Sequence, residues 1–335
     1  MGQPEDYISM SVGYDFYQTK SENFIAIHNF FEDIQPDNFE RDCLLTILAS
    51  FLEFNNPEEK FNIFSGTTRN GKSKLAYLIS LAFGDYYGTI QSNFLTKELP
   101  SSDAANPLIL NIRKKRIVVA SEPEEGQYMN TSLIKGITGK DKFYGRYLYS
   151  NEIMTFTLKF KLVLLCNSKP KVNTNTDESF WNRCRCIEFP TTFVDNPKDK
   201  NEKKIDINLD EKMTHWRNDF MLLLLDYYKI YTRNGLKLTN NVLKYTNKYK
   251  NENDHFKQFA DEYINEDTDE YIVWTELKDA FIEWFVENKG NKYPSPQIIK
   301  EYFSNKIFKE EEKTRKINKK SVRGWKGFKL TYNDD

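Results

Sequence analysis

The hydrophobic positions change their spacing along the chain, and these changes separate helical stretches from strand-forming ones. Up to about residue 60 the apolar residues keep the spacing of one helix face. The residues that show it best are Leu44, Leu45, Leu48, Phe51 and Leu52. This run begins after Asp37-Asn38 and ends at Asn55-Asn56-Pro57, which are typical helix boundaries. We therefore expect the amino-terminal part to be helical.

The middle of the chain carries short apolar runs of the length of buried strands. They occupy residues 61–64, 116–120 and 161–166. Helical patterns follow the first two runs, beginning at Lys72 and near Tyr128. Strands that alternate with helices predict an α/β fold, with a parallel sheet covered by helices on both faces.

The carboxyl-terminal half returns to helical spacing. The charged stretch from Asp195 to Asp210 is expected to be a loop, followed by an apolar helix that ends near Asn234-Gly235. Beyond residue 250 one helix face is formed by Trp274, Leu277, Phe281, Trp284 and Phe285. A second helix opens at Pro294 and Pro296, and Arg323–Leu330 resembles paired short strands. Two helices and a basic hairpin, in this order, predict a winged-helix-like domain.

The charges are balanced overall but not locally. Among 335 residues, 48 are basic and 49 acidic, which gives a net charge of -1. Residues 252–270 are strongly acidic, whereas residues 306–329 are strongly basic. A basic tail can bind polyanions even in a neutral protein, and a solvated run of charges is the alternative.

Composition excludes several classes of protein. The mean hydropathy is -0.69, and no apolar run approaches the roughly 20 residues that cross a bilayer, which excludes a multi-span membrane protein. The polar, acidic amino terminus is unlike a secretory signal. Four cysteines and three histidines are too scattered for a disulfide framework or a zinc site, so we expect buried thiols in an intracellular protein.

One motif carries the main functional signal. Residues 66–73 match G-x-x-x-x-G-K-[ST] between the strand at 61–64 and the helix at Lys72. The residues of this P-loop are Gly66, Thr67, Thr68, Arg69, Asn70, Gly71, Lys72 and Ser73. Backbone N–H groups of such a loop converge on phosphate oxygens. Lys72 is expected to reach the β- and γ-phosphates and Ser73 to hold Mg²⁺, which predicts nucleoside triphosphate binding.

Further polar residues follow the predicted strands. Glu122 comes after the strand at 116–120 and is expected to hold Mg²⁺, with Glu124 or Glu125 as a partner acid. Asn167 follows the strand at 161–166, as a sensor of the γ-phosphate or as a simple turn residue. Arg183 and Arg185 fit either an arginine finger that faces a neighbouring subunit or a pair of surface salt bridges.

Five segments together resemble one family. They are NIFSGTTRNGKSKL, RIVVASEPEEG, LIKGITGKDKFYGRYLY, KLVLLCNSKP and FWNRCRCIEF, within residues 40–190. They are similar to superfamily 3 helicases, and more narrowly to the helicase part of primase-helicases of poxviruses, other large DNA viruses, phages and plasmids. The resemblance implies an AAA+-type ring, usually a homo-hexamer. Such a ring hydrolyses ATP with Mg²⁺ between subunits while it moves 3′ to 5′ on single-stranded DNA. A GTPase is disfavoured because no N-K-x-D motif follows.

The resemblance also assigns roles to single residues. Residues 66–73 match the Walker A loop, Glu122 the Walker B acid, Asn167 the sensor and Arg183 the family arginine, with Arg185 as a second candidate. A β-hairpin that grips DNA in the ring channel corresponds to residues 143–149 and 153–156, paired across 150–152. Its candidate DNA-binding residues are Lys140, Lys142, Arg146 and Tyr149. The family's Lys-His pair at the hairpin tip is missing, and packing is the alternative role for the tyrosines.

The expected organisation has four parts. Residues 1–56 form a helical collar, 57–192 the P-loop ATPase core, 193–248 a helical extension and 249–335 a winged-helix-like DNA-binding domain. The family's primase domain is absent from this chain, so a primase domain or partner is expected elsewhere. If the protein is viral, the host cytoplasm is its expected location.

The expected function is an ATP-dependent replicative DNA helicase acting on forked duplexes. The alternative is a DNA-binding ring or loader in which ATP controls assembly rather than unwinding. A packaging or protein-remodelling motor is a third possibility, and the basic winged-helix-like tail disfavours it.

Overall fold

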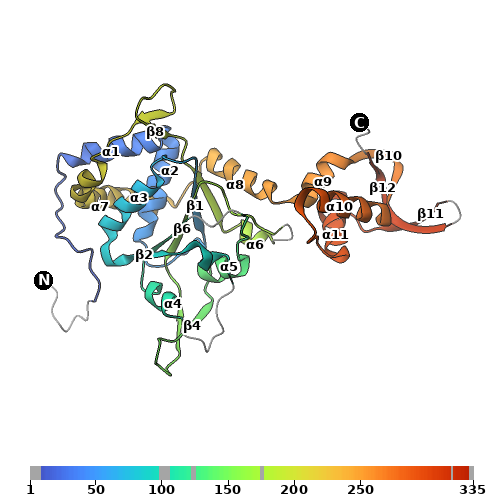
Figure 1. The fold of residues 1–335 in the computed structure, drawn as a ribbon, viewed down its shortest axis with the longest axis horizontal. Helices are drawn as coiled ribbons and strands as arrows, with labels where there is room; N and C mark the ends of the chain where they lie inside the picture. Colours follow the sequence, from blue (N-terminus) through green and yellow to red (C-terminus); the bar gives the residue numbers. More distant parts are fainter. Residues whose placement is uncertain (1–8, 98–105, 122–125, 174–176, 318–319, 332–335) are drawn as a thin grey trace. The chain divides into compact units, whose positions relative to one another are not determined.

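The computed structural model describes residues 9–97, 106–121, 126–173, 177–317 and 320–331. The chain divides into two compact units (Figure 1). The first unit comprises residues 1–172 and 177–247, and the second comprises residues 248–335 with 173–176. Each unit is described by itself.

A five-stranded parallel sheet forms the centre of the first unit, in the order β2-β3-β6-β1-β7. The strands are β1 (Phe61–Ser65), β2 (Tyr87–Ile90), β3 (Ile117–Ala120), β6 (Lys161–Cys166) and β7 (Cys184–Glu188). Strands that are covered on both faces have nearly continuous apolar sequences, and β1, β3 and β6 are the three strands predicted from such runs. The predicted α/β class is confirmed.

Helices cover both faces of this sheet (Figure 1). On one face lie α1 (Asn23–Ile34), α2 (Asn38–Ala49), α3 (Lys72–Phe83) and α7 (Leu209–Asn234). On the other face Phe180 of α6 (Glu178–Trp181) contacts Phe61 of β1 at a ring distance of 6.0 Å, and α6 packs on α5 (Thr131–Thr138). Alternate strand residues such as Phe64 and Val163 point to the first face, as the pleat of a strand requires.

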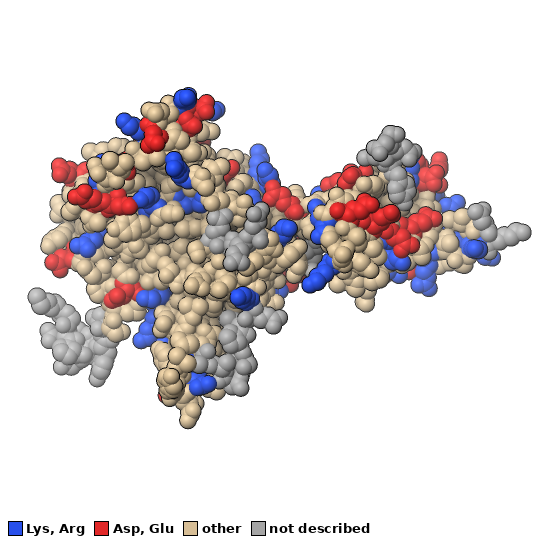
Figure 2. Space-filling view, in the orientation of Figure 1, with Lys and Arg blue, Asp and Glu red and all other residues tan. Residues whose placement is uncertain are grey.

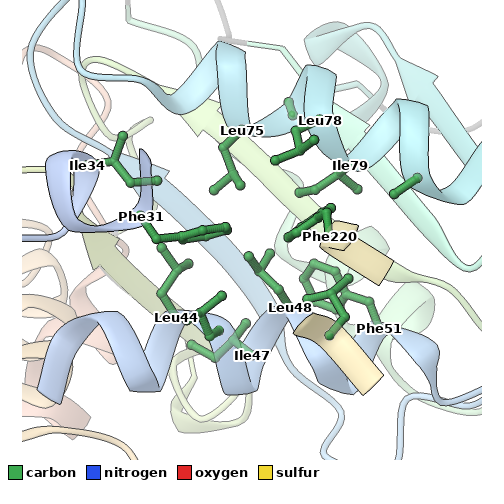
Figure 3. Close-up of a cluster of buried hydrophobic side chains, with 14 of the residues drawn as sticks. Phe31, Ile34, Leu44, Ile47, Leu48, Phe51, Leu75, Leu78, Ile79 and Phe220 are labelled. Carbon is green, nitrogen blue, oxygen red and sulfur yellow. The ribbon is translucent and has the colours of Figure 1, made fainter. Parts of the chain in front are cut away.

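The largest core of the first unit joins its amino-terminal helices to the P-loop helix. Figure 3 shows Phe31 of α1, Leu48 of α2, Leu75 of α3 and Phe220 of α7 in one cluster, and all four side chains are completely buried. The segments predicted as a collar (1–56) and as a helical extension (193–248) therefore share one core with the segment predicted as the ATPase core (57–192). A role of α1 and α2 in ring closure stays a prediction.

Local sequence signals explain where the helices begin and end. The Asp37 carboxylate accepts hydrogen bonds from the backbone N–H groups of Phe39 and Glu40 and so caps α2. The long helix α7 ends at Asn234, directly before Gly235, where the sequence predicted its end. α2 ends at Ala49 and a 3₁₀ turn (Ser50–Leu52) follows, so the helical run stops before Asn55-Asn56-Pro57, where its end was predicted.

A short strand lies in the region 195–210, which was predicted to be a loop, and it pairs with another short strand just before that region. β8 (Thr192–Val194) and β9 (Glu202–Lys204) form a parallel pair. The prediction for residues 195–210 is therefore wrong at β9. Its three charged residues leave no apolar alternation to detect, although the backbone is paired and Lys203 forms an ion pair with Asp33.

The remaining elements of the first unit are short. They are two 3₁₀ turns (Gly84–Tyr86 and Ser92–Leu95), α4 (Pro107–Ile112), β4 (Lys142–Gly145), β5 (Met154–Thr157) and the beginning of α8 (Asn240–Glu252). The second helix of the middle region was expected near Tyr128. It begins instead at Thr131, because the Asn130 side chain accepts a hydrogen bond from Leu133 N–H and caps α5.

The second unit combines helices with a three-stranded antiparallel sheet, in the order β10-β12-β11. Its further elements are α9 (His255–Tyr263), β10 (Ile264–Val273), α10 (Trp274–Lys289), α11 (Pro296–Tyr302), a π-helical turn (Phe303–Phe308), β11 (Lys313–Ile317) and β12 (Lys320–Leu330). The predicted face of α10 is confirmed, since Leu277, Phe281, Trp284 and Phe285 are all buried.

Two features of the second unit differ from the sequence prediction. The segment 323–330 belongs to one long strand, β12, which pairs with β11 on one side and with β10 on the other. The acidic strand β10 was not foreseen, because its exposed Glu266, Asp269 and Glu270 interrupt any strand pattern. The winged-helix-like assignment of this unit stays a prediction. Within the described residues, no helix combines the length and the apolar character that a membrane span requires.

The shared core of the first unit predicts how it unfolds. Leu48→Ala should lower the free energy of unfolding by about 2–5 kcal/mol, measured by urea denaturation followed by circular dichroism, because it leaves a cavity among α1, α2 and α7. Ile25→Ala is the matched control, since Ile25 is 70% exposed and its truncation should change the value by less than about 0.5 kcal/mol. An independent collar would instead give a separate early transition in the Leu48 variant and leave the sheet folded.

Candidate nucleotide-binding site

The P-loop connects the carboxyl end of β1 to the first residue of α3. Gly71 has φ 85°, and a Cβ atom there would lie 2.5 Å from Cγ2 of Ile34 at the end of α1. A Cβ atom on Gly66 would lie 2.5 Å from the carbonyl oxygen of Phe189. Both glycines of the motif are therefore required by the close approach of neighbouring segments.

The connection between β7 and β8 supports the loop from outside. Phe189 N–H donates to the carbonyl oxygen of Ser65 at 2.8 Å, and Phe193 N–H donates to that of Arg69 at 2.7 Å. The hydroxyl groups of Thr67 and Thr192 lie 3.4 Å apart. Sequence analysis did not identify this support, because backbone-to-backbone hydrogen bonds leave no mark on residue type.

Lys72 turns its side chain back into the loop, where only 5% of the residue is exposed. Its ammonium group lies 2.9 Å from the carbonyl oxygen of Gly66 and 3.2 Å from that of Thr67. It also donates to Oδ1 of Asn70 at 2.9 Å and to Oδ1 of Asn167 at 3.2 Å. The structure thus brings the P-loop lysine and the candidate sensor asparagine into direct contact.

This contact follows from the pairing of two parallel strands. Ser65 at the end of β1 is in register with Cys166 at the end of β6. The next residues, Gly66 and Asn167, therefore emerge at the same edge of the sheet. β3 lies on the other side of β6, with Ala120 in register with Leu164. Glu122, Glu124 and Glu125, the candidate acids beyond β3, lie outside the described residues.

The remaining loop residues fit a phosphate and its metal ion. Thr67, Thr68 and Arg69 are exposed, and so is Ser73 in the first turn of α3. The amino-terminal end of a helix favours negative charge, and an accessible hydroxyl there is a suitable oxygen ligand for Mg²⁺. Among the described residues, no cluster of three or more His, Cys, Asp or Glu side chains forms a separate metal site. Cys43, Cys166, Cys184 and Cys186 are all buried, as expected.

Arg183 and Arg185 lie near the amino-terminal ends of the strands, whereas the P-loop lies at their carboxyl ends. Arg185 is in register with Asn62 near the start of β1, and its side chain, 5% exposed, pairs with Glu58 at 2.6 Å. Arg183 directly precedes β7 and pairs with Glu59 at 2.8 Å, with 21% of its side chain exposed. Neither arginine is therefore placed near the P-loop of its own chain.

Buried lysine side chains also lie near the amino-terminal ends of these strands. Lys161, the first residue of β6, donates hydrogen bonds to the carbonyl oxygens of Glu53 and Asn55. Burial lowers its pKa to about 8. Burial also lowers the pKa of the Lys60 ammonium group, which donates to the carbonyl oxygen of Asn182. The hydrogen bonds of Lys161 and Lys60 thus hold the loop before β1 against the neighbouring segments.

The predicted hairpin exists, but its strands are shorter than expected. β4 (142–145) pairs with β5 (154–157), so the connecting loop comprises residues 146–153 rather than 150–152. Arg146 lies in this loop, half-buried, and donates to the carbonyl oxygen of Ser150 at 2.9 Å. The positive φ of Tyr149, 62°, also excludes a strand at that position.

The candidate DNA contacts differ in how far they are presented to solvent. Lys140, Lys142 and Tyr149 are exposed, whereas the guanidinium group of Arg146 donates a hydrogen bond to the carbonyl oxygen of Ser150 within the loop. Tyr147, Leu148 and Ile153 are exposed as well, so the tip is aromatic and aliphatic rather than basic. In Figure 2 the lower part of the first unit, around β4, is accordingly mostly tan. Grouped exposed apolar residues of this kind mark interaction sites.

No family model matches the chain. Among curated proteins it is 31% identical over 320 residues to "Putative helicase L207/L206" of Acanthamoeba polyphaga mimivirus, covering 91% of this chain and 33% of that protein. It is 28% identical over 319 residues to the similarly named helicase 022R of Frog virus 3, covering 89% and 31%. An African swine fever virus protein named as primase C962R matches at 23% identity over 273 residues, covering 78% of this chain and 28% of that protein. The chain spans about a third of the length of these relatives.

Solved structures show the same fold. The C-terminal region of NrS-1 superposes with a TM-score of 0.56 at 14% identity, covering 94% of this chain and 78% of that one. A second form of that region gives a TM-score of 0.54 at 16% identity, with coverage of 94% and 77%. At this identity the likeness concerns the fold alone. The sequence relatives confirm the resemblance inferred from the motifs: the chain is a relative of the proteins named as helicases in large DNA viruses and a virophage.

Proposed function

We propose that this chain is the helicase part of a viral replication protein, an ATP-dependent DNA helicase that works as a ring on single-stranded DNA. The observation that carries the proposal is the contact of Lys72 with Asn167, which joins the P-loop to the end of the neighbouring parallel strand. The helicase names of its viral relatives support the same conclusion.

ATP would lie with its phosphates in the loop of residues 66–73. The Lys72 ammonium group would exchange some of its loop acceptors for β- and γ-phosphate oxygens. The Ser73 hydroxyl and the Glu122 carboxylate would hold Mg²⁺, which neutralises charge on the phosphate oxygens. Asn167 would orient the attacking water or the γ-phosphate from the end of β6, because it already lies beside Lys72.

A ring explains the position of Arg183. Since this arginine lies at the sheet edge opposite the P-loop, it can reach a phosphate only in a neighbouring copy. Its partial exposure leaves it able to exchange partners. Arg185 is buried against Glu58 and Asn62, so we assign it a role in holding β7 to the loop before β1. A homo-hexamer moving 3′ to 5′ is the arrangement that the family resemblance implies.

Two surfaces would hold DNA. The aromatic tip of the β4–β5 hairpin would contact single-stranded bases, with Lys140 and Lys142 near the phosphates. The basic hairpin of the second unit would bind DNA phosphates, and Figure 2 shows basic side chains along the lower edge and at the right-hand end of this unit. Because C962R is named as a primase, we also infer that a primase domain or partner works with this chain inside the infected cell, in the host cytoplasm.

The helicase proposal is tested by ATP hydrolysis with and without single-stranded DNA, together with unwinding of a 3′-tailed fork. The expected result is hydrolysis that DNA stimulates and that separates the strands. Lys72→Ala should reduce the turnover at least a hundredfold, because it removes the cation that stabilises charge on the phosphates. Hydrolysis without strand separation would favour the loader, and undiminished hydrolysis by the Lys72 variant would overturn the site.

The role of Arg183 in a neighbouring subunit is tested by mixing variants. Arg183→Ala should bind ATP normally but lose hydrolysis at least a hundredfold, because an arginine finger acts only in the transition state. Mixing it with the Lys72→Ala protein should restore part of the activity, since some interfaces then combine an intact loop with an intact arginine. If the mixture stays inactive although mixed oligomers form, Arg183 does not act between subunits.

The basic hairpin is tested through the salt dependence of DNA binding. The structure argues against deleting residues 306–335, because Phe308 and Trp325 belong to the buried core of the second unit. Instead, four exposed basic residues of the hairpin are changed to Gln: Arg315, Lys316, Lys320 and Lys326. Binding to single-stranded DNA should weaken, and the slope of log K against log salt should become shallower by about 0.7 per lost phosphate contact.

The matched control is Lys229→Gln on α7, an exposed lysine of the first unit, which should leave the slope unchanged. An unchanged slope in the four-residue variant would mean that the basic run is only a solvated surface.

A further inference from the structure

Four consecutive basic residues form the turn between α4 and β3. They are Arg113, Lys114, Lys115 and Arg116. None of them belongs to the loop of residues 66–73 or to the β4–β5 hairpin. Lys115 is held against the first unit, because its ammonium group donates to the carbonyl oxygen of Asp85 at 2.7 Å. Lys114 is exposed, and the two arginines are half-buried.

An exposed aromatic ring beside this turn brings a further cation to it. Phe54, in the loop before β1, is 49% exposed. The guanidinium carbon of Arg116 lies 4.8 Å from the centre of the Phe54 ring, and the Lys159 ammonium group lies 4.7 Å from it. The faces of an aromatic ring carry negative charge density and attract cations. One ring therefore holds two positive charges from different segments of the chain close together.

The cations of this surface have no acidic partner. We call Arg113, Lys114, Arg116 and Lys159 the basic patch. Within the described ranges none of the four forms an ion pair, whereas Lys74 and Lys203 of the same unit pair with aspartates at 2.6 and 3.0 Å. Like charges that lie close together without a counter-charge repel one another. A bound anion would remove this repulsion, so the patch is suited to an anionic ligand.

The basic patch adjoins the loop of the β4–β5 hairpin. Arg113 donates a hydrogen bond to the Tyr147 hydroxyl group in that loop at 3.0 Å. The helix α4, which leads to the turn, lies beside β4 (Figure 1), with the Leu110 side chain against Gly145. The tip of the hairpin presents aromatic and aliphatic side chains. Cations of the patch and aromatic residues of the tip therefore lie next to one another.

We propose that the basic patch binds the phosphates of the single-stranded DNA whose bases contact the hairpin tip, and that Phe54 is a positioning residue that keeps Arg116 and Lys159 side by side. A DNA backbone carries regularly spaced negative charges, which match several cations spread along an extended turn. Cations beside aromatic side chains are typical of surfaces for single strands, because the bases of a duplex are stacked on each other and leave no face to contact. The inference rests on the proposed function and adds a surface that holds the DNA backbone.

The test measures binding of a single-stranded oligothymidylate to the full chain, without nucleotide, by fluorescence anisotropy at several salt concentrations. The variant is Lys114→Gln with Lys159→Gln, since neither side chain donates a hydrogen bond within the described residues. The slope of log K against log salt should become shallower by about 1.4, and the affinity at about 0.1 M salt should fall about twentyfold. An unchanged slope would overturn the proposal.

The matched control is Lys198→Gln with Lys200→Gln. These two lysines are exposed in the loop between β8 and β9, and their replacement removes the same amount of charge from the first unit. The control should keep the slope of the unaltered chain, and an equal loss in both variants would mean that only the net charge matters. ATP hydrolysis without DNA should be the same in both variants, because none of the four lysines lies in the nucleotide site.

The role of Phe54 is tested by two replacements. Phe54→Leu removes the ring that attracts both cations and should weaken DNA binding about two- to fivefold, whereas Phe54→Tyr keeps the ring and should bind normally. Both should unfold at the temperature of the unaltered chain, because the side chain is half exposed. Equal DNA binding by the Leu and Tyr variants would overturn the role of the ring.

A neighbouring copy with an acidic surface is the other partner that the charge of the patch would fit. Mass photometry of the double-lysine variant separates the two, since DNA binding by the patch leaves the distribution of oligomers unchanged. Loss of the oligomer together with DNA binding would place the patch between subunits and overturn the proposal.

Failure of this inference can be told apart from failure of the proposed function. An unaltered chain that neither binds the oligothymidylate nor hydrolyses ATP faster in its presence would reject the proposed function. Binding and stimulation by the unaltered chain, with the same salt slope in the double-lysine variant, would reject only the patch.

Discussion

The contacts of one ammonium group, that of Lys72, depend on how the whole first unit is folded. Lys72 donates hydrogen bonds both to its own loop and to Asn167, which directly follows the strand β6 and is more than ninety residues away in the sequence. This is possible only because β1 and β6 are parallel neighbours in exact register at their carboxyl ends. A shift of one residue in this pairing would turn the side chains of β6 to the opposite faces and move Asn167 out of reach. The helices on both faces hold this register.

The sequence predicted those parts of the site that depend on local chemistry. The glycines and the lysine of residues 66–73 follow from what a phosphate loop requires, and Asn167 follows from its place after a buried strand. The support of the loop by Phe189 and Phe193 was not predictable, because it consists of backbone hydrogen bonds that any residue can form. For Arg185 a surface salt bridge was one of two predicted alternatives. The partner, Glu58, and the burial of the pair were not predicted, since burial at that end of the strands is a property of the folded chain.

The same distinction holds for the fold. Apolar runs identified β1, β3 and β6. Asp37 marked the start of α2, and Gly235 marked the end of α7. The strands β9 and β10 were missed because their charged side chains hide the alternation that reveals a strand. The helices of residues 1–56 were predicted, but not their place, because an apolar helix face does not specify which neighbour covers it. The core of Figure 3 joins them to α3 and α7.

The ion pair between Arg183 and Glu59 has a consequence for any ring that these chains form. An arginine that reaches across to a neighbour must first leave its own glutamate, so each contact between subunits replaces one charge pair with another. Such an exchange has a small net free energy, because the attraction that is lost offsets most of the attraction that is gained. Contacts of this kind form and break easily. That reversibility suits an arginine which, in the proposed ring, would engage and release a neighbouring phosphate in each round of hydrolysis.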